Sequence, residues 1–373
     1  RRFFNSSADI QSAAFLKNVD FAFPKLTQNP HKDLISVYLT RMRKSVTKFP
    51  ITDAKIREIF VAAGLGEVTE IAEISDGWYN SVFSAVAESG QKYVLKIAPE
   101  KSVHVLTHEQ GLMASEVAFY KLLAEKTAII TPKVVFSDFS ETIIPTPYFI
   151  MNFLSGTRLD KAKLTASEKE EVKVQWAWVY SEFHKIKGTG YGYTQAGLKD
   201  NWKDGLAHMT QILIDDASSF GKKCKMGDKL LKFIDKFAAE LEGVPCVCIS
   251  FDLHPLNIFC QKTEDGIRLA ILDLERGFWG DPVGDFTSAE TFTPFAKKSI
   301  IAHYNKFAAQ PIEVNRNTQI RYELLNAYLA VIMYTERFSR FKGAGKFLNP
   351  VFWIGTVACR HIAKTSFSAL NKM

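Results

Sequence analysis

The sequence predicts an α+β protein in which a small antiparallel-sheet lobe precedes a larger, mostly helical lobe. Short strand-like runs with turn residues between them cluster before Asn152, whereas apolar residues at helical spacing dominate from about residue 160. The change falls near Asn152–Gly156, so we expect a short connection between two unequal lobes with a ligand cleft between them. The predicted domains are an N-terminal extension, a sheet lobe and a helical lobe, at residues 1–50, 51–151 and 152–373.

Composition limits the class of protein. The chain has 373 residues, of which 47% are hydrophobic and 23% charged, as in an ordinary globular protein with a sizeable core. The net charge of +7 is spread along the chain and suits a polyanionic ligand. Because no basic stripe is interleaved with aromatic residues, nucleic acid is not a predicted partner. No apolar run reaches the length of a membrane span, and the oligomeric state stays open.

The cysteines and the first residues bear on localisation. The five cysteines are an odd and low count, and none has a metal or redox spacing, which favours reduced thiols in a cytoplasmic protein. Arg1 and Arg2 are not followed by an apolar stretch, so we expect no secretory signal.

The N-terminal half contains two predicted helices and a sheet. The apolar spacing predicts an amphipathic helix over residues 34–46 with a basic face, which suits either a membrane surface or, as we favour, packing on its own domain. A second helix follows Thr52 and ends at Gly64. Alternating runs around Ile74, at 82–86 and at 93–97 predict a small antiparallel sheet.

The remaining elements follow the same periodicities. Helical spacing predicts a helix over 105–126, and strand patterns lie within 131–140 and 146–154. The predicted helices of the second lobe occupy 167–188, 202–242, 286–309 and 318–341. Residues 246–275 are an exception within this mostly helical lobe, because their pattern predicts two strands around the turn Lys262–Gly266.

Three polar residues in this exception predict phosphoryl-transfer chemistry. Asp252 and Asn257 are five residues apart, and Asp273 ends the apolar run that follows. A loop aspartate can accept the proton of a substrate hydroxyl, while the oxygens of Asn257 and Asp273 suit Mg²⁺ beside a triphosphate. The alternative is that Asp252 and Asn257 stabilise a turn and Asp273 merely ends a strand.

The sheet lobe supplies a matching set of phosphate-binding candidates. Lys96 lies in the middle of an apolar strand, where a charged side chain is costly unless it is paired. Glu116 on the following helix offers that pairing, in the arrangement that orders nucleotide phosphates. Upstream, the turn in "SDGWYNSVF", with Gly77 and Asn80, would cover the phosphates through backbone N–H groups. The alternative is that Lys96 points to solvent on the outer face of the sheet.

These features occur in the order of a known family. The sequence resembles the aminoglycoside phosphotransferase/choline kinase-like family, which has a protein-kinase-like bilobal fold. "FDLHPLNIFC" is similar to its H-G-D-L-H-P-G-N-I loop, and "LAILDLERGFWGDPVGDF" to its I-I-D-W-E-x-A-x-x-G-D-P-x-x-D-L segment. "YVLKIAP", "SEVAFYKLL" and "YFIMNFLSGTRL" resemble its lysine strand, glutamate helix and inter-lobe connection. The resemblance covers residues 52–340.

The resemblance implies a role for each candidate. It makes Asp252 the catalytic base, Asn257 and Asp273 the Mg²⁺ ligands, and Lys96 with Glu116 the phosphate grip. It also implies that an adenine pocket is lined by the backbone of Met151, Asn152, Phe153 and Leu154. The chain departs from the family pattern at three positions, where Ser250, Phe251 and Leu256 replace the usual His, Gly and Gly.

The resulting expectation is an ATP- and Mg²⁺-dependent kinase that phosphorylates a hydroxyl of a small metabolite or antibiotic. A polycationic aminoglycoside favours an acidic cleft, and the net charge leans mildly against it without excluding it. The alternative is a non-catalytic nucleotide-binding relative that serves as a binding or regulatory module. A protein kinase is disfavoured, because Gly280-Asp281-Pro282 follows Asp273 too closely to leave an activation segment.

Overall fold

The computed structural model describes residues 47–74, 79–290, 293–340 and 350–373. The predicted helix at 34–46 and the turn residue Gly77 therefore lie outside the described residues. None of the described helices combines the length and the apolar character that crossing a membrane requires.

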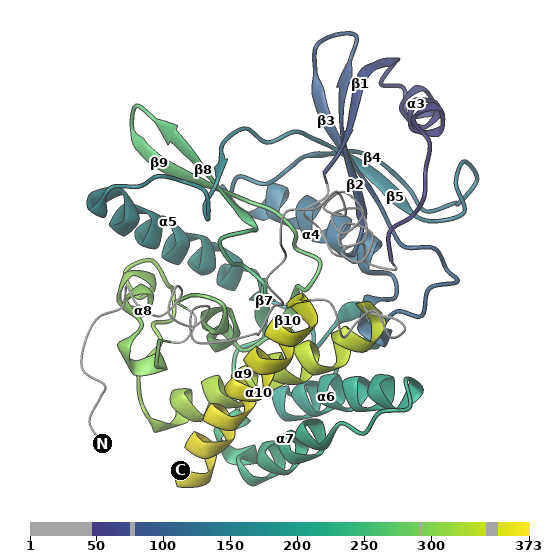
Figure 1. Ribbon diagram of the computed structural model, residues 1–373. Coiled ribbons are helices and arrows are strands. Elements are labelled where there is room, and N and C mark those ends of the chain that lie inside the picture. The colour runs from purple at the N-terminus through teal and green to yellow at the C-terminus, as the bar shows by residue number, and fades with distance from the viewer. Residues whose placement is uncertain (1–46, 75–78, 291–292, 341–349) are drawn as a thin grey trace, which may run out of the picture. The chain divides into compact units, whose positions relative to one another are not determined.

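A five-stranded antiparallel sheet forms the first part of the described chain (Figure 1). Its strand order is β1-β2-β3-β5-β4, so β3 lies in the centre and pairs with both β2 and β5. The strands are β1 (Val68–Glu73), β2 (Ser81–Ala87), β3 (Lys92–Ile97), β4 (Val134–Asp138) and β5 (Tyr148–Asn152).

Alternation along the central strands gives the sheet two buried faces. Leu95 of β3 and Ile150 of β5 belong to the core that includes helix α3 (Asp53–Ala62). Val94 and Phe149 point the other way and belong to the main core, which includes helix α4 (Leu112–Lys126). Successive side chains of a strand alternate between faces, so Lys96 shares the α4 face with Val94.

The second part is mostly helical, and it carries two small sheets. β6 (Thr157–Arg158), β8 (Ile258–Thr263) and β9 (Gly266–Ile271) form one sheet, and β7 (Val247–Ile249) pairs with β10 (Phe278–Gly280). Helix α5 packs against β9 and α9 packs against α10, as Figure 1 shows. The helices are α5 (Ala166–Lys185), α6 (Trp202–Ser219), α7 (Lys225–Lys236), α8 (Ser299–Tyr304), α9 (Arg316–Arg340) and α10 (Pro350–Lys372). The predicted α+β class is confirmed.

Three predicted helices are shorter than expected, and glycine and proline account for two of the differences. The helix expected over 105–126 begins at Leu112, because the 3-10 turn over Thr107–Glu109 (η1) ends at the extended Gln110 and Gly111, with a φ of 71°, is the N-cap of α4. The segment 202–242 is split into α6, α7 and a 3-10 turn. The segment 286–309 is helical only in short pieces, since Pro294 lacks the N–H that a continuous helix needs. The sequence reasoning also missed α10.

The segment that joins β3 to α4 is anchored to the helical part of the chain. The Thr107 hydroxyl donates to Asp216 of α6 at 2.6 Å, and the Thr107 backbone N–H donates to the same carboxylate at 2.9 Å. Glu109 forms an ion pair with Arg340 of α9. The backbone oxygen of His108 accepts a hydrogen bond from the side chain of Gln195 at 2.8 Å. This segment therefore links the two parts of the fold at a distance from the connection that follows β5.

Candidate active site

Lys96 joins residues from three separate elements. Its Nζ lies 2.7 Å from Glu116 Oε2 on α4 and 2.7 Å from Asp273 Oδ1, which follows β9. Glu275 Oε2 is 3.4 Å away. The side chain of Lys96 is 7% exposed, so the lysine points inward and is paired with Glu116 as predicted, and the alternative of an outward lysine is excluded.

The three carboxylates are held together by one ammonium group. Burial favours the neutral amine, but the charges of Asp273 and Glu116 outweigh it and hold the pKa of Lys96 well above its usual value. Burial, reinforced by the charge of Asp273, raises the pKa of Glu275 to about 8. Asp273 is part-buried, with 37% of its side chain exposed, and although burial opposes the shift, Lys96 lowers its pKa. Lys96 and Asp273 are thus charged at neutral pH, while Glu275 is largely protonated.

Asn257 and Asp273 are brought together by the β8–β9 hairpin. The backbone N–H of Leu272 donates to the backbone oxygen of Asn257 at 2.9 Å, and the backbone N–H of Asp273 donates to the Tyr120 hydroxyl at 2.9 Å. Asn257 Nδ2 donates to the backbone oxygen of Asp252 at 3.1 Å, which leaves its Oδ1 as the atom for a ligand. Carboxylate oxygens of Glu116, Asp273 and Glu275 lie within 4.8 Å of one another. Together with Oδ1 of Asn257, these carboxylates provide the oxygen ligands that Mg²⁺ prefers.

Asp252 lies in the loop between β7 and β8 and contacts two basic side chains. Its Oδ2 is 3.0 Å from Arg276 Nε, and its Oδ1 is 3.6 Å from His254 Nε2. Burial raises the pKa of Asp252, although Arg276 and His254 oppose the shift. The carboxylate is 22% exposed, so a substrate group has access to it.

The departures at Ser250 and Phe251 are accommodated by specific contacts. The Ser250 hydroxyl and the Phe251 backbone N–H both donate to Asp285 Oδ1 at 2.7 Å. The other oxygen of this fully buried carboxylate is 3.0 Å from His184 Nε2. Asp285 therefore fixes the start of the loop that carries Asp252, and Ser250 supplies one of the hydrogen bonds.

Phe251 has a φ of 55°, in the left-handed region that favours glycine. The family pattern places a glycine at this position, so the backbone conformation fits that pattern although the side chain differs. The Phe251 ring is buried and packs against Phe278 and Tyr328, with ring centroids 5.1 and 5.8 Å away. Aromatic packing offsets the cost of the backbone conformation.

This conformation predicts an unusual order of stabilities. We expect Phe251→Ala to lower the free energy of unfolding by about 3–5 kcal/mol, as for other buried phenylalanines. Phe251→Gly should be less destabilising than Phe251→Ala by about 1 kcal/mol, because glycine tolerates positive φ. Urea unfolding of both variants measures the difference. The control is Phe286, which is buried but is not among the positive-φ residues, and where Gly should be worse than Ala. The same order at both positions would contradict the prediction.

Of the turn predicted to cover the phosphates, the structure describes the residues from Tyr79 onward. Asn80 Nδ2 donates to Glu275 Oε2 at 2.9 Å, which joins the turn to the carboxylate cluster. The side chains of Thr47 and Lys48 donate to the backbone oxygens of Tyr79 and Asn80. The segment that begins at Thr47 therefore holds the end of the turn in place beside Lys96.

The four residues expected to line an adenine pocket lie at the end of β5 and just after it. In the sheet, Lys96 pairs with Phe149 near the start of β5, whereas Asn152 at its end pairs with Tyr93, so these four residues lie further along the sheet than the partner of Lys96. The backbone N–H groups of Asn152 and Phe153 donate to Lys133 and Lys92, at 3.0 Å each. Those two N–H groups are therefore used within the sheet and are not available to a base.

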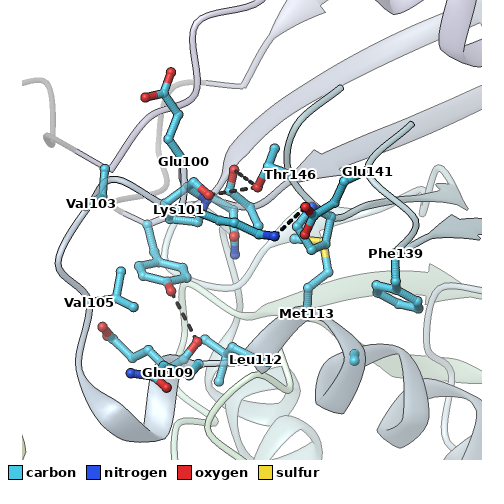
Figure 2. A pocket seen from close by; sticks show the side chains of 18 of the residues that line it. Glu100, Lys101, Val103, Val105, Glu109, Leu112, Met113, Phe139, Glu141 and Thr146 are labelled. Carbon is cyan, nitrogen blue, oxygen red and sulfur yellow. Dashed lines mark hydrogen bonds and ion pairs between the residues drawn. The ribbon is translucent and has the colours of Figure 1, made fainter. Parts of the chain in front are cut away.

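A cavity of about 610 Å³ lies beside this site. It is bounded by the β3–α4 segment, the first turn of α4 and the loop between β4 and β5, and Lys101 and Glu141 form an ion pair at its wall (Figure 2). Asn80 and Glu109 also line it. Among the described residues, Asp252 and Asp273 are not part of its lining, so the cavity is separate from the catalytic candidates.

Comparison with known proteins decides the family. The model of the phosphotransferase enzyme family matches residues 70–308, which is more than half of the chain. The chain belongs to the phosphotransferase enzyme family. The match includes Lys96, Glu116, Asp252, Asn257 and Asp273.

The relative and the solved structures that resemble this chain are distant from it in sequence. A subtelomeric hrmA-associated cluster protein of Aspergillus fumigatus is 23% identical over 212 residues, which cover 54% of this chain and 38% of that protein. The chain thus spans well under half the length of this curated relative. A putative aminoglycoside phosphotransferase of Ralstonia eutropha has a similar structure, with a TM-score of 0.62 at 15% identity over 87% of this chain and 99% of that one. The streptomycin–ATP complex of APH(2″)-IIa gives 0.51 at 17% identity, over 87% and 98%.

In this phosphotransferase, several site residues were missed by sequence reasoning. Arg276 contacts Asp252, and Glu336 and Arg340 on α9 continue the chain of charges. Tyr120 supports Asp273. A usable signal was that Arg276 directly follows Glu275 and lies three residues after Asp273, so a cation stands among the carboxylates of the predicted site. Glu336 and Arg340 are also four residues apart, so they share one helix face.

Proposed function

We propose that this phosphotransferase transfers the γ-phosphate of ATP to a hydroxyl group of a small molecule. The observation that carries the proposal is the position of Lys96, at 2.7 Å from both Glu116 and Asp273. A lysine fixed between a helix glutamate and the aspartate after the catalytic loop is the arrangement that grips nucleotide phosphates. The APH(2″)-IIa structure that contains ATP has the same fold, which supports the choice of nucleotide.

In the proposed step, Asp252 orients the acceptor hydroxyl and accepts its proton. The hydroxyl oxygen forms a bond to the γ-phosphorus, and the bond from that phosphorus to the β–γ bridging oxygen breaks. ADP leaves with the electron pair of the broken bond. Lys96 holds the nucleotide phosphates during the transfer, and Glu116 fixes Lys96. No covalent intermediate on the protein is required.

The oxygens of Asn257 and Asp273 would hold Mg²⁺. When bound, the metal offsets the negative charge of the triphosphate. Asp273 has a depressed pKa and is charged at neutral pH, as a metal ligand must be. The Tyr120 hydroxyl and the β8–β9 hairpin keep Asp273 and Asn257 next to one another.

The proposal is tested by incubating the protein with ATP labelled in the γ-phosphate, Mg²⁺ and a panel of alcohols, sugars and antibiotics. We expect labelled phosphate to appear on the hydroxyl of one compound class, as detected by mass spectrometry. If ADP and ATP bind but neither water nor any compound receives phosphate, the protein is a binding module and the proposal fails. Label on generic protein substrates instead would indicate a protein kinase.

A further inference from the structure

The guanidinium group of Arg276 has three nitrogen atoms, and two of them contact carboxylates. Nε contacts the catalytic candidate Asp252 at 3.0 Å, and Nη2 contacts Glu336 at 2.8 Å. Within the described part of the chain, no protein partner is assigned to Nη1. The side chain is 19% exposed, so this remaining donor faces solvent beside the group that would accept the hydroxyl proton.

Asp252 and the two nearest acidic groups of this chain of charges, Glu336 and Glu109, are each in contact with an arginine. Glu336 lies between Arg276 and Arg340, and Arg340 also binds Glu109. The chain Asp252–Arg276–Glu336–Arg340–Glu109 thus alternates in sign from the catalytic loop to the β3–α4 segment. Charges that are paired in this way attract a cationic ligand weakly, because each carboxylate already has a guanidinium at contact distance. A cluster that could bind a metal, formed by His108, Glu109 and Glu336, has the same two arginines against its carboxylates.

We propose that Arg276 binds an anionic oxygen group, a carboxylate or a phosphate, on the molecule whose hydroxyl is phosphorylated. This inference rests on the proposed function and names the class of its acceptor. With Nε and Nη2 occupied, Nη1 is the atom that would donate a charge-assisted hydrogen bond to an oxygen of such a group. Because Arg276 touches the Asp252 carboxylate, the anionic group lies only a few bonds from the reacting hydroxyl. The acceptor is therefore a hydroxy acid or a phosphorylated alcohol, and not a polyamine.

Matched acceptors test the charge preference directly. One series shares a polyol chain and consists of gluconate, sorbitol phosphate, sorbitol and glucamine. A second series carries a hydroxymethyl group on a benzene ring, opposite a carboxylate, a hydroxymethyl or an aminomethyl group. We expect the anionic members to exceed the ammonium members about tenfold or more in kcat/KM. Gluconate against sorbitol phosphate separates a carboxylate site from a phosphate site.

Variants separate recognition from a merely structural role of Arg276. Arg276→Gln should abolish the preference for anionic acceptors, whereas a purely structural role would lower kcat/KM equally for all members of a series. Glu336→Gln removes a competing carboxylate and should lower the KM of anionic acceptors. Arg268→Gln, which removes a largely exposed arginine on β9, should leave the preference unchanged. ADP binding by each variant confirms that the protein is folded.

Binding measurements distinguish failure of this inference from failure of the proposed function. Calorimetric titration of each acceptor into the protein with ADP and Mg²⁺ requires no turnover. If no phosphate is transferred but anionic members bind more tightly and lose this advantage in Arg276→Gln, the proposed function fails and the anion site stands. The inference is overturned if ammonium members are preferred, if no anionic member binds at millimolar concentration, or if Arg276→Gln keeps the preference.

Discussion

Asp252→Asn should lower the rate of phosphate transfer by about 10²–10⁴-fold, because a positioned base contributes that much. Nucleotide affinity should be nearly unchanged, since the phosphate-binding candidates Lys96 and Asp273 are untouched. The asparagine still accepts a hydrogen bond from Arg276 but no longer takes up the hydroxyl proton. The measurement is single-turnover transfer to an accepted substrate, together with the dissociation constant of ADP.

The control for this substitution is Asp265→Asn, in the exposed turn between β8 and β9. The side chain of Asp265 is 85% exposed, so its loss should alter neither transfer nor binding. Unchanged transfer in Asp252→Asn would remove Asp252 from the catalytic role. A parallel loss of ADP binding would instead mean that the substitution disturbs the whole loop.

Lys96→Met should weaken nucleotide binding severely and destabilise the protein by about 3–5 kcal/mol, the usual cost of leaving buried charges without their partner. Without the ammonium group, Glu116, Asp273 and Glu275 face one another unpaired. Their shared burial makes the loss larger as the pH rises. In the parent protein the charge of Lys96 lowers the pKa values of all three carboxyl groups, and that of Glu275 is still about 8. Without Lys96 these pKa values rise, so the native variant holds protons that the unfolded chain releases, and its stability relative to the parent falls further as the pH rises.

Urea unfolding between pH 5 and pH 9, roughly spanning this titration, measures the stability, and ADP titration measures the binding. Lys92→Met is the matched control, because Lys92 lies on the same strand and is exposed. If the Lys96 variant binds ADP as tightly as the parent protein does, Lys96 does not bind the nucleotide phosphates. A stability difference that shrinks as the pH rises would refute the electrostatic explanation.

The bilobal α+β architecture could be predicted from the sequence because strand and helix periodicities are local properties of the chain. The pairing of Lys96 with Glu116 was predictable as well, since a charged residue in the middle of a buried strand needs a counterion. The start of α4 was not predicted, because the conformation of Gly111 overrides a helical pattern that continues on both sides. Arg276 meets Glu336 across 60 residues of sequence, and no local pattern reports such a contact, although the spacing of Glu336 and Arg340 places those two on one helix face.

Phe251 shows why a departure from a family motif is difficult to interpret from sequence. Replacement of glycine suggests a changed backbone, yet the φ of 55° retains the conformation that glycine favours. What changed is the packing, in which Phe278 and Tyr328 hold a large ring. The loss of a motif residue therefore does not imply the loss of the loop geometry that the motif encodes.

The anchoring of the β3–α4 segment affects how the cleft can move. Thr107 and Glu109 bind α6 and α9, on the helical lobe, while the segment itself continues into the helix that carries Glu116. The sheet lobe is thus attached to the helical lobe both through the connection after β5 and through the β3–α4 segment. A rigid-body rotation about the connection after β5 would have to break the Arg340–Glu109 ion pair. We expect nucleotide entry to proceed by a small twist of the sheet lobe rather than by wide opening, so the protein should change little in radius of gyration when it binds ATP.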